Sequence, residues 1–311
     1  MNSRSIAYAQ ICLNSLLQNS LDPLHLVVIG DDDNDAQKVQ SFCDTLVPLV
    51  PSQHKIDVIG KSAIDKIATS ALDRYPLTRM FREGHPCWRK LTDPLLLAQS
   101  DELIVIDPDV FFPNIFQFPK TPNNGVLLMW QSSNCLHPPD AVRTAFTVGL
   151  ALADHTDIGV CQFQRGSVTL QLLESILGSF GDFDFPRSAH IESIIWAAIA
   201  LEIGGGYLAP NRWICWNHSL YKRIAIRLGA NPSSYLQGLN LSEAYCLHLG
   251  GKIKTFAPNA FSDYKFGEQP LDAYDSATAP FQPYSISKFE RKMRTRQLIR
   301  AAGFYAVFGE N

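Results

Sequence analysis

The sequence lacks the features of membrane-spanning, secreted and disulfide-stabilised proteins. No apolar stretch is long enough to cross a bilayer, and the first residues, Met1–Ile6, contain no apolar signal core. The seven cysteines are scattered, odd in number and never spaced as Cys-x-x-Cys. We therefore expect reduced, mostly buried thiols in a cytoplasmic protein.

A surplus of charge is also missing. The formal net charge is -3, whereas proteins that bind nucleic acids nonspecifically usually carry a basic surplus. We therefore expect no nucleic-acid partner, and the acidic excess is too small to indicate a basic one. Hydrophobic residues make up 46% and charged residues 18% of the chain, which is typical of a globular protein.

Helical and strand patterns alternate through the first part of the chain. Helical spacing of apolar residues occurs at 6–18, 35–47, 63–72 and 88–99, and short apolar runs occur at 24–29, 55–59 and 103–106. This alternation predicts an α/β fold with a mainly parallel sheet flanked by helices. Later strands are expected at 126–130 and 158–163, and later helices at 168–177 and 191–201. We expect one domain over 1–256, followed by an extension over 257–311.

The extension is expected to contain a loop and then a basic helix at 285–300. This helix carries Lys288, Arg291, Lys292, Arg294, Arg296 and Arg300 against one acid, Glu290. A basic segment with interleaved aromatic residues can lie on an anionic membrane surface, which would place the protein peripherally on the inner face of a membrane. A solvated basic helix packed on the domain fits the same pattern, so both interpretations stay open.

Two aspartates directly follow a buried strand. Residues 107–109 read Asp-Pro-Asp after the apolar run at 103–106. Ligands of open α/β sheets bind at the carboxyl ends of the strands. Two carboxylates at such an end can share one magnesium or manganese ion, which usually also holds substrate phosphates. The alternative is an ordinary strand-to-loop turn, in which Asp and Pro are common.

A second element of interest lies far downstream. Residues 247–254 read Leu-His-Leu-Gly-Gly-Lys-Ile-Lys. The neutral imidazole of His248 can complete a metal site of mixed oxygen and nitrogen ligands. Gly251 permits close approach of the backbone to a phosphate, and Lys254 can neutralise phosphate charge. Taken alone, His248 is also consistent with a structural histidine at a turn.

Together the two elements resemble the GT-A fold glycosyltransferases, in particular glycosyltransferase family eight. That family carries a strand ending in Asp-x-Asp and a distant His-x-x-Gly-x-x-Lys. Asp107 and Asp109 match the first element, and His248, Gly251 and Lys254 match the second. The resemblance implies that the two aspartates and the histidine bind manganese or magnesium. It also implies that Lys254 stabilises the leaving diphosphate.

Further positions match the family more loosely. The resemblance places Lys90 and Asp93 near the donor sugar, and Asp157 at the Asn of a strand that reads Asn-x-Gly-Val. Glu192 roughly matches an Asp-Gln element on a later helix and is therefore a candidate catalytic residue. Tyr8, near the start of the first helix, is the remaining candidate for contact with the nucleotide.

The implied activity is transfer of a hexose from a nucleotide diphosphate donor to a hydroxyl of a glycan or lipid-linked acceptor, with retention of configuration. The sequence departs from the family where Thr255 and Phe256 replace Pro-Trp, and where the Asp-Gln pair is not reproduced. The family also has a central apolar strand before the first helix, whereas only Met1–Ser5 precede that helix here. We expect either a start further upstream or a degenerate relative.

Two other functions remain to be weighed. A non-catalytic remnant that binds nucleotide sugar or glycan is the main alternative, and the missing strand favours it. A metal-dependent phosphotransferase or nucleotidyltransferase also uses paired carboxylates. That class usually has a Gly-rich phosphate loop early in the chain, and this sequence has none.

Overall fold

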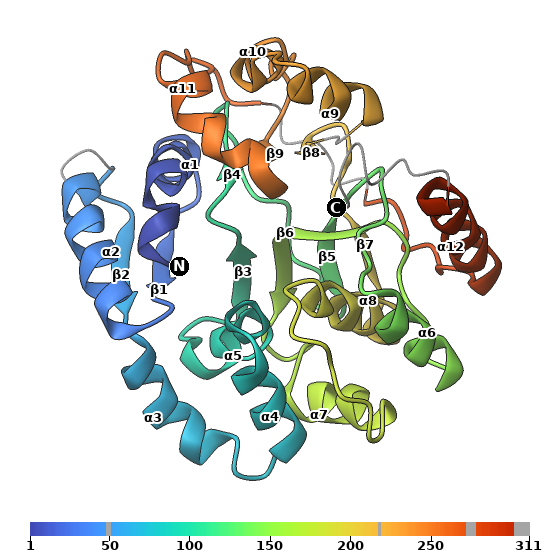
Figure 1. Cartoon of the computed structure of the whole chain (residues 1–311). Helices are drawn as coiled ribbons and strands as arrows, with labels where there is room; N and C mark the ends of the chain where they lie inside the picture. The colour runs from blue at the N-terminus through green and yellow to red at the C-terminus, as the bar shows by residue number, and fades with distance from the viewer. Residues whose placement is uncertain (48–50, 217–218, 272–277, 302–311) are drawn as a thin grey trace.

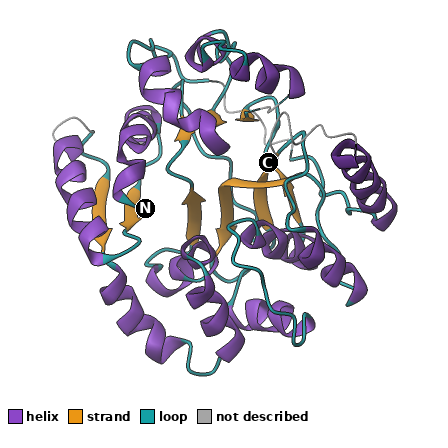
Figure 2. Cartoon of the chain, in the orientation of Figure 1, coloured by secondary structure: helices purple, strands orange, loops and turns teal. Residues whose placement is uncertain are grey.

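The computed structural model describes residues 1–47, 51–216, 219–271 and 278–301. Helices surround a set of short strands (Figures 1 and 2). The strands are β1 His25–Ile29, β2 Lys55–Ile59, β3 Glu102–Ile106, β4 Val110–Phe111, β5 Val126–Trp130, β6 Thr156–Gln164, β7 Gly205–Tyr207, β8 Trp213–Cys215 and β9 Cys246–His248. The α-helices are α1 Ile6–Asn19, α2 Asp33–Leu46, α3 Lys61–Ala71, α4 Pro76–Gly84, α5 Asp93–Leu97, α6 Pro139–Thr147, α7 Leu170–Ser179, α8 Ile191–Ile203, α9 Leu220–Arg227, α10 Pro232–Gln237, α11 Ala257–Phe261 and α12 Ile286–Ala301. Short 3-10 helices are η1 Ser3–Ser5, η3 Pro86–Leu91 and η4 Gly251–Phe256.

Parallel and antiparallel strand pairs are both present, which corrects the expectation of a mainly parallel sheet. The described strands are ordered β1-β2, β3-β6-β5-β7 and β4-β9-β8. Strand β6 is antiparallel to both β3 and β5, and β4 is antiparallel to β9. Helix α6 lies between β5 and β6 in sequence, but Trp130 at the end of β5 pairs with Thr156 at the start of β6. The chain therefore returns alongside β5, and the intervening helix does not produce a parallel crossover.

The helix expected at 88–99 is broken into η3 and α5. Thr92 ends the first piece and precedes the second, which has Pro94 near its start. Proline has no backbone N–H and disfavours helical geometry in the residue before it, so it is tolerated only in a first helical turn. As a result of the break, Lys90 pairs with Asp107, whereas Asp93 pairs with Arg82.

A cavity lies between strands β1 and β3. Its volume is about 1150 Å³, and its lining includes Leu24 and Leu26 on one side and Leu103 and Ile104 on the other. In the described part of the chain, β1 pairs only with β2, and β3 pairs only with β6.

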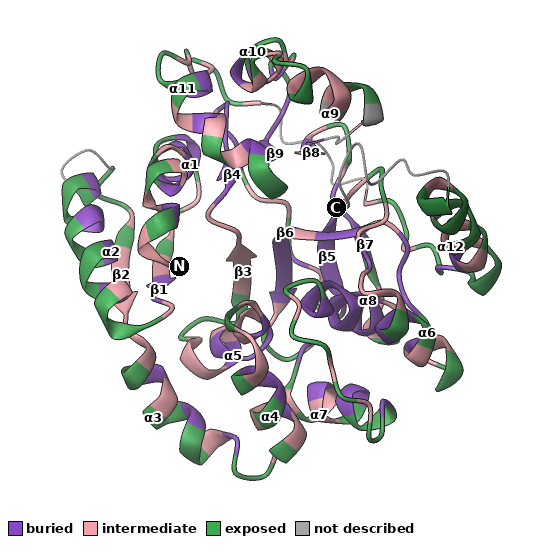
Figure 3. Ribbon diagram, in the orientation of Figure 1, coloured by how far each residue is buried: buried purple, intermediate pink, exposed green. Residues whose placement is uncertain are grey.

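Helix α8 forms the centre of the main core. Every residue from 191 to 200 is buried, and the helix packs on β6 and η3. Figure 3 shows the same burial along α8, β5 and β6. A helix that is apolar on all sides is stable only when covered on all sides. Glu192 lies in this buried stretch with 1% of its surface exposed, so it must find a charged or polar partner there.

Helix α1 holds the chain that follows the two aspartates. The Phe112 N–H donates to Ser15 Oγ over 2.9 Å, and the Asn19 side chain donates to the Phe112 carbonyl over 2.7 Å. On the other side, the rings of Phe111 and Phe261 stack with centroids 4.3 Å apart. Residues on both sides of the domain boundary expected at position 256 therefore contribute to the packing around β4.

The basic helix expected at 285–300 corresponds to α12. Phe289 is 2% exposed and packs in the main core. Two of the basic side chains bind the domain, because Lys288 pairs with Asp154 and Lys292 donates to the Asn134 carbonyl over 2.7 Å. Burial lowers the pKa of Lys292 to about 8. None of the helices in the described ranges combines the length and apolarity that a bilayer crossing requires.

Candidate metal centre

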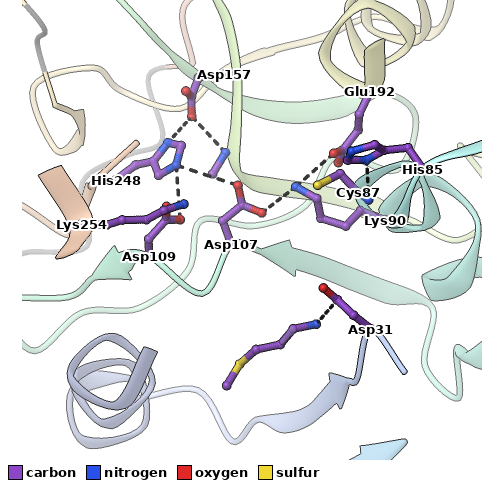
Figure 4. Close-up of polar contacts among 12 residues, drawn as sticks. Asp31, His85, Cys87, Lys90, Asp107, Asp109, Asp157, Glu192, His248 and Lys254 are labelled. Carbon is purple, nitrogen blue, oxygen red and sulfur yellow. Dashed lines mark hydrogen bonds and ion pairs between the residues drawn. The ribbon is translucent and has the colours of Figure 1, made fainter. Parts of the chain in front are cut away.

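Strand pairing brings the three expected metal ligands together. Asp107 follows β3, and its N–H donates to the Gly159 carbonyl of β6 over 2.9 Å. Val110 of β4 is paired with His248 of β9, which places the histidine beside the Asp-Pro-Asp turn. The His248 Nε2 atom lies 3.5 Å from Asp109 Oδ1 and 3.8 Å from Asp107 Oδ2. The group forms a candidate metal site, with one ligand atom from each residue within 4.8 Å of the others (Figure 4).

The donor set suits a divalent cation that accepts mixed oxygen and nitrogen ligands. Two carboxylates and one imidazole favour manganese or magnesium over softer ions. Asp109 and His248 are buried, with 3% and 8% of their surfaces exposed, whereas the Asp107 side chain is 17% exposed. The site is therefore open mainly on the Asp107 side.

Asp157 orients the imidazole. Its Oδ1 lies 2.8 Å from His248 Nδ1 and also accepts the Gly159 N–H over 2.9 Å (Figure 4). Burial would raise the pKa of Asp157, but the ion pair and hydrogen bond with His248 lower it below its ordinary value. An ionised Asp157 keeps a proton on Nδ1 and leaves Nε2 to face Asp107 and Asp109. Such a carboxylate–histidine pair is the usual outer support of a metal-binding histidine.

Gly159 makes room for the imidazole. A Cβ atom added at this position would lie 2.5 Å from His248 Nδ1 and 3.1 Å from Asp157 Oδ1. We predict that Gly159→Ala weakens manganese binding by about 10–100-fold, the range found when the outer support of a metal ligand is lost. Titration calorimetry checks this value. The matched control is Gly166→Ala, because no atom lies within 4 Å of a Cβ there, and equal affinities for both variants would contradict the prediction.

Lys254 closes the site opposite Asp157. Its Nζ donates to Asp109 Oδ2 over 2.8 Å and lies 5.2 Å from the centre of the Tyr8 ring. Burial would raise the pKa of Asp109, but His248 and Lys254 together hold it well below its ordinary value. Gly251, which begins η4, has a φ of 74°, a left-handed conformation that favours glycine.

Lys90 and Glu192 extend the polar cluster on the other side of Asp107. Lys90 Nζ lies 2.6 Å from Asp107 Oδ1 and 3.1 Å from Glu192 Oε2 (Figure 4). Burial raises the pKa of Glu192 to about 8, although Lys90 acts in the opposite direction. Lys90 thus links Asp107 of the candidate metal centre to Glu192 in the buried helix α8.

The structure gives Asp93 a different surrounding from the one expected. Its side chain is 1% exposed, and its two oxygens lie 2.6 and 3.3 Å from Arg82. Arg82 also donates to Asp65 over 2.7 Å. The carboxylate therefore pairs with a buried arginine and has almost no surface with which to contact a donor.

The sequence reasoning missed Cys215. Strands β8 and β9 pair so that Cys215 is the partner of His248. Its thiol interacts with both Asp157 and His248, and together the three residues form a second candidate metal-binding group. Two paired strands of three residues each leave little pattern in the sequence. The proximity of Cys215 to His248 could therefore not be predicted from the sequence.

Comparisons with known proteins agree with the fold. The crystal structure of mouse xyloside xylosyltransferase 1 in its apo form is similar, with a TM-score of 0.50. The match covers 80% of this chain and 93% of the xylosyltransferase chain at 10% sequence identity. Neither the protein-family models nor the curated proteins give a match. The structural likeness shows that this chain shares the overall α/β fold of that xylosyltransferase.

Proposed function

We propose that the chain is a metal-dependent glycosyltransferase, which moves a sugar from a nucleotide diphosphate donor to an acceptor hydroxyl. The observation that carries the proposal is the convergence of Asp107, Asp109 and the Nε2 atom of His248. The glycosyltransferase-type fold supports it. A hexose donor, retention of configuration and a glycan or lipid-linked acceptor follow from the resemblance of the sequence and belong to the same proposal.

Each side chain of the site has a task in this proposal. A manganese or magnesium ion held by Asp107, Asp109 and His248 would neutralise the charge of the diphosphate. Asp157 keeps the Nε2 atom of His248 available. Lys254, beside Asp109, stabilises the leaving diphosphate. Tyr8 lies beside this lysine, Gly251 begins the 3-10 helix η4 that carries it, and both are candidates for contact with the nucleotide.

Lys90 and Glu192 act on the donor side of the same site. The buried Glu192 side chain lies 3.1 Å from the Lys90 ammonium group and holds it beside Asp107, so that the ammonium group can pair with the donor. We place Glu192 as a positioning residue for Lys90, which narrows the catalytic role that the resemblance implies.

Donor turnover tests the proposal. The purified chain is incubated with manganese and a panel of uridine, guanosine, adenosine and cytidine diphosphate sugars, and release of nucleoside diphosphate is followed. We expect slow release from one donor class, and loss of release with EDTA. Manganese-dependent binding of a nucleoside diphosphate without any release would instead support a binding protein that transfers nothing.

Manganese affinity is predicted to rise with pH. Burial would lower the pKa of His248, but Asp157 and the hydrogen bonds to Asp109, Asp157 and Cys215 raise it well above the ordinary value of 6.5. The ion must displace this proton from Nε2, so affinity should rise by up to about tenfold per pH unit below the raised pKa and level off above it.

In the metal-free protein the same shift in the pKa of His248 stabilises the fold below pH 6.5, and this stabilisation is lost as the pH rises through the raised pKa.

Calorimetry in buffers of different ionisation enthalpy measures both the affinity and the proton released. Affinity that stays constant from about pH 6 to about pH 9, with no proton released, would contradict a histidine ligand.

A further inference from the structure

A second set of ligands lies on the far side of His248. The ring has Asp107 and Asp109 near Nε2 and Asp157 at Nδ1, and the Cys215 thiol interacts with both Asp157 and the ring. One ligand atom each from Asp157, Cys215 and His248 lies within 4.8 Å of the others. Asp157 and His248 are buried, while Cys215 is half-buried.

The two sides of the ring differ in chemistry. On the Nε2 side the partners are carboxylate oxygens, which suit hard cations. In the second group a sulfur joins the imidazole and the carboxylate of Asp157, which contacts Nδ1. Zinc is bound in proteins by this combination of thiolate, imidazole and carboxylate, and it tolerates a water as its fourth ligand.

We propose that Asp157, Cys215 and the Nδ1 atom of His248 form a zinc-binding site whose occupation blocks the manganese site. Zinc takes the places of the thiol proton on Sγ and the ring proton on Nδ1, and both protons pass to solvent. The ring then carries its remaining proton on Nε2, as an imidazole bound through one nitrogen does at neutral pH.

That protonation state excludes the first site. A protonated Nε2 donates a hydrogen bond to Asp109 and has no lone pair for manganese, so His248 can serve only one ion at a time. The zinc site itself stands on the geometry of three side chains, whereas its inhibitory effect rests on the proposed function. The two ions also draw on different oxygens, because Asp157 contributes only to the zinc site.

Cobalt(II) tests the site directly in the full chain. Cobalt takes zinc positions, and a thiolate bound to it gives a charge-transfer absorption band in the near ultraviolet. We expect this band with one equivalent of cobalt, and its loss on addition of zinc. Cys215→Ser should abolish the band, whereas Cys135→Ser should keep it, because the Cys135 thiol donates to the Thr156 carbonyl and lies outside the candidate group. A wild-type protein without the band, or a band that persists in Cys215→Ser, overturns the proposal.

Alkylation of the wild-type chain gives a readout that does not depend on a variant that folds. Zinc should slow iodoacetamide modification of Cys215, read by mass spectrometry, and leave Cys135 unchanged. Equal rates for Cys215 with and without zinc would overturn the site.

The inhibitory step is tested separately. Zinc is expected to abolish manganese-dependent binding of nucleoside diphosphates in the wild type. Asp109→Ala should retain the cobalt band and lose the nucleotide binding. If the wild type shows the cobalt band but no manganese-dependent nucleotide binding, the proposed function fails while the zinc site stands. If zinc binds and manganese-dependent binding persists undiminished, mutual exclusion fails.

Discussion

Asp109→Ala is expected to abolish manganese-dependent binding of nucleoside diphosphates. Asp109 is 3% exposed, and its two oxygens face different partners, with Oδ1 3.5 Å from His248 and Oδ2 2.8 Å from Lys254. The alanine removes one metal ligand and leaves Lys254 without its carboxylate. Loss of an outer support costs about 10–100-fold in metal affinity, so loss of a ligand should cost at least about 100-fold.

Calorimetric titration of manganese, and of each nucleoside diphosphate with manganese present, measures this loss. Asp140→Ala is the matched control, because the Asp140 side chain is 82% exposed and lies on α6. Circular dichroism establishes that both variants are folded. Binding by Asp109→Ala at the wild-type level, or binding that EDTA leaves unchanged, would mean that the ion is held elsewhere.

Asp93→Ala is expected to destabilise the protein by about 3–5 kcal/mol, as is found when one partner of a buried ion pair is removed. Asp93 is 0% exposed and Arg82 is 5% exposed, so the alanine leaves a buried guanidinium short of its closest carboxylate. Asp65 still pairs with Arg82 but is partly exposed, and it cannot replace both hydrogen bonds. Chemical denaturation of the wild type and the variant measures the difference in unfolding free energy.

Asp65→Ala is the matched control for this prediction. It removes the outer partner of the same arginine, and because Asp65 is 34% exposed, the loss should be clearly smaller. At a temperature where Asp93→Ala is still folded, its affinity for nucleoside diphosphates should equal that of the wild type. An unchanged stability together with weaker nucleotide binding would restore the donor-side role that the resemblance implies.

Much of the fold was predictable, because several segments carry a strong local pattern. The periodicity of α1, α2 and α8 and the apolar runs of β1, β3 and β5 identified these elements, which the structure confirms. The direction of β6 could not be read in the same way. It depends on the end of the sheet at which the chain re-enters after α6, which the local apolar pattern of β6 does not show. Pro94 signals the break at Thr92, and its effect outweighs the helical periodicity of the segment.

The candidate site shows the same difference between features with a local sequence pattern and features that depend on tertiary packing. Asp107 and Asp109 were visible because they share one strand end, and His248 because its spacing to Lys254 carries a second pattern. The contact of Asp157 with His248 depends on the register of β6 against β3 and of β4 against β9. Register is set by packing of the folded sheets, so a single sequence does not reveal such a contact.

The proposed metal centre is tested most directly by anomalous diffraction at the manganese absorption edge, from crystals grown with manganese and the best-binding nucleoside diphosphate. We predict one anomalous peak bound by Asp107, Asp109 and the Nε2 atom of His248 at about 2 Å, with the diphosphate on the Lys254 side. A nucleotide bound without a peak at these three residues, or a peak held by other side chains, would contradict it.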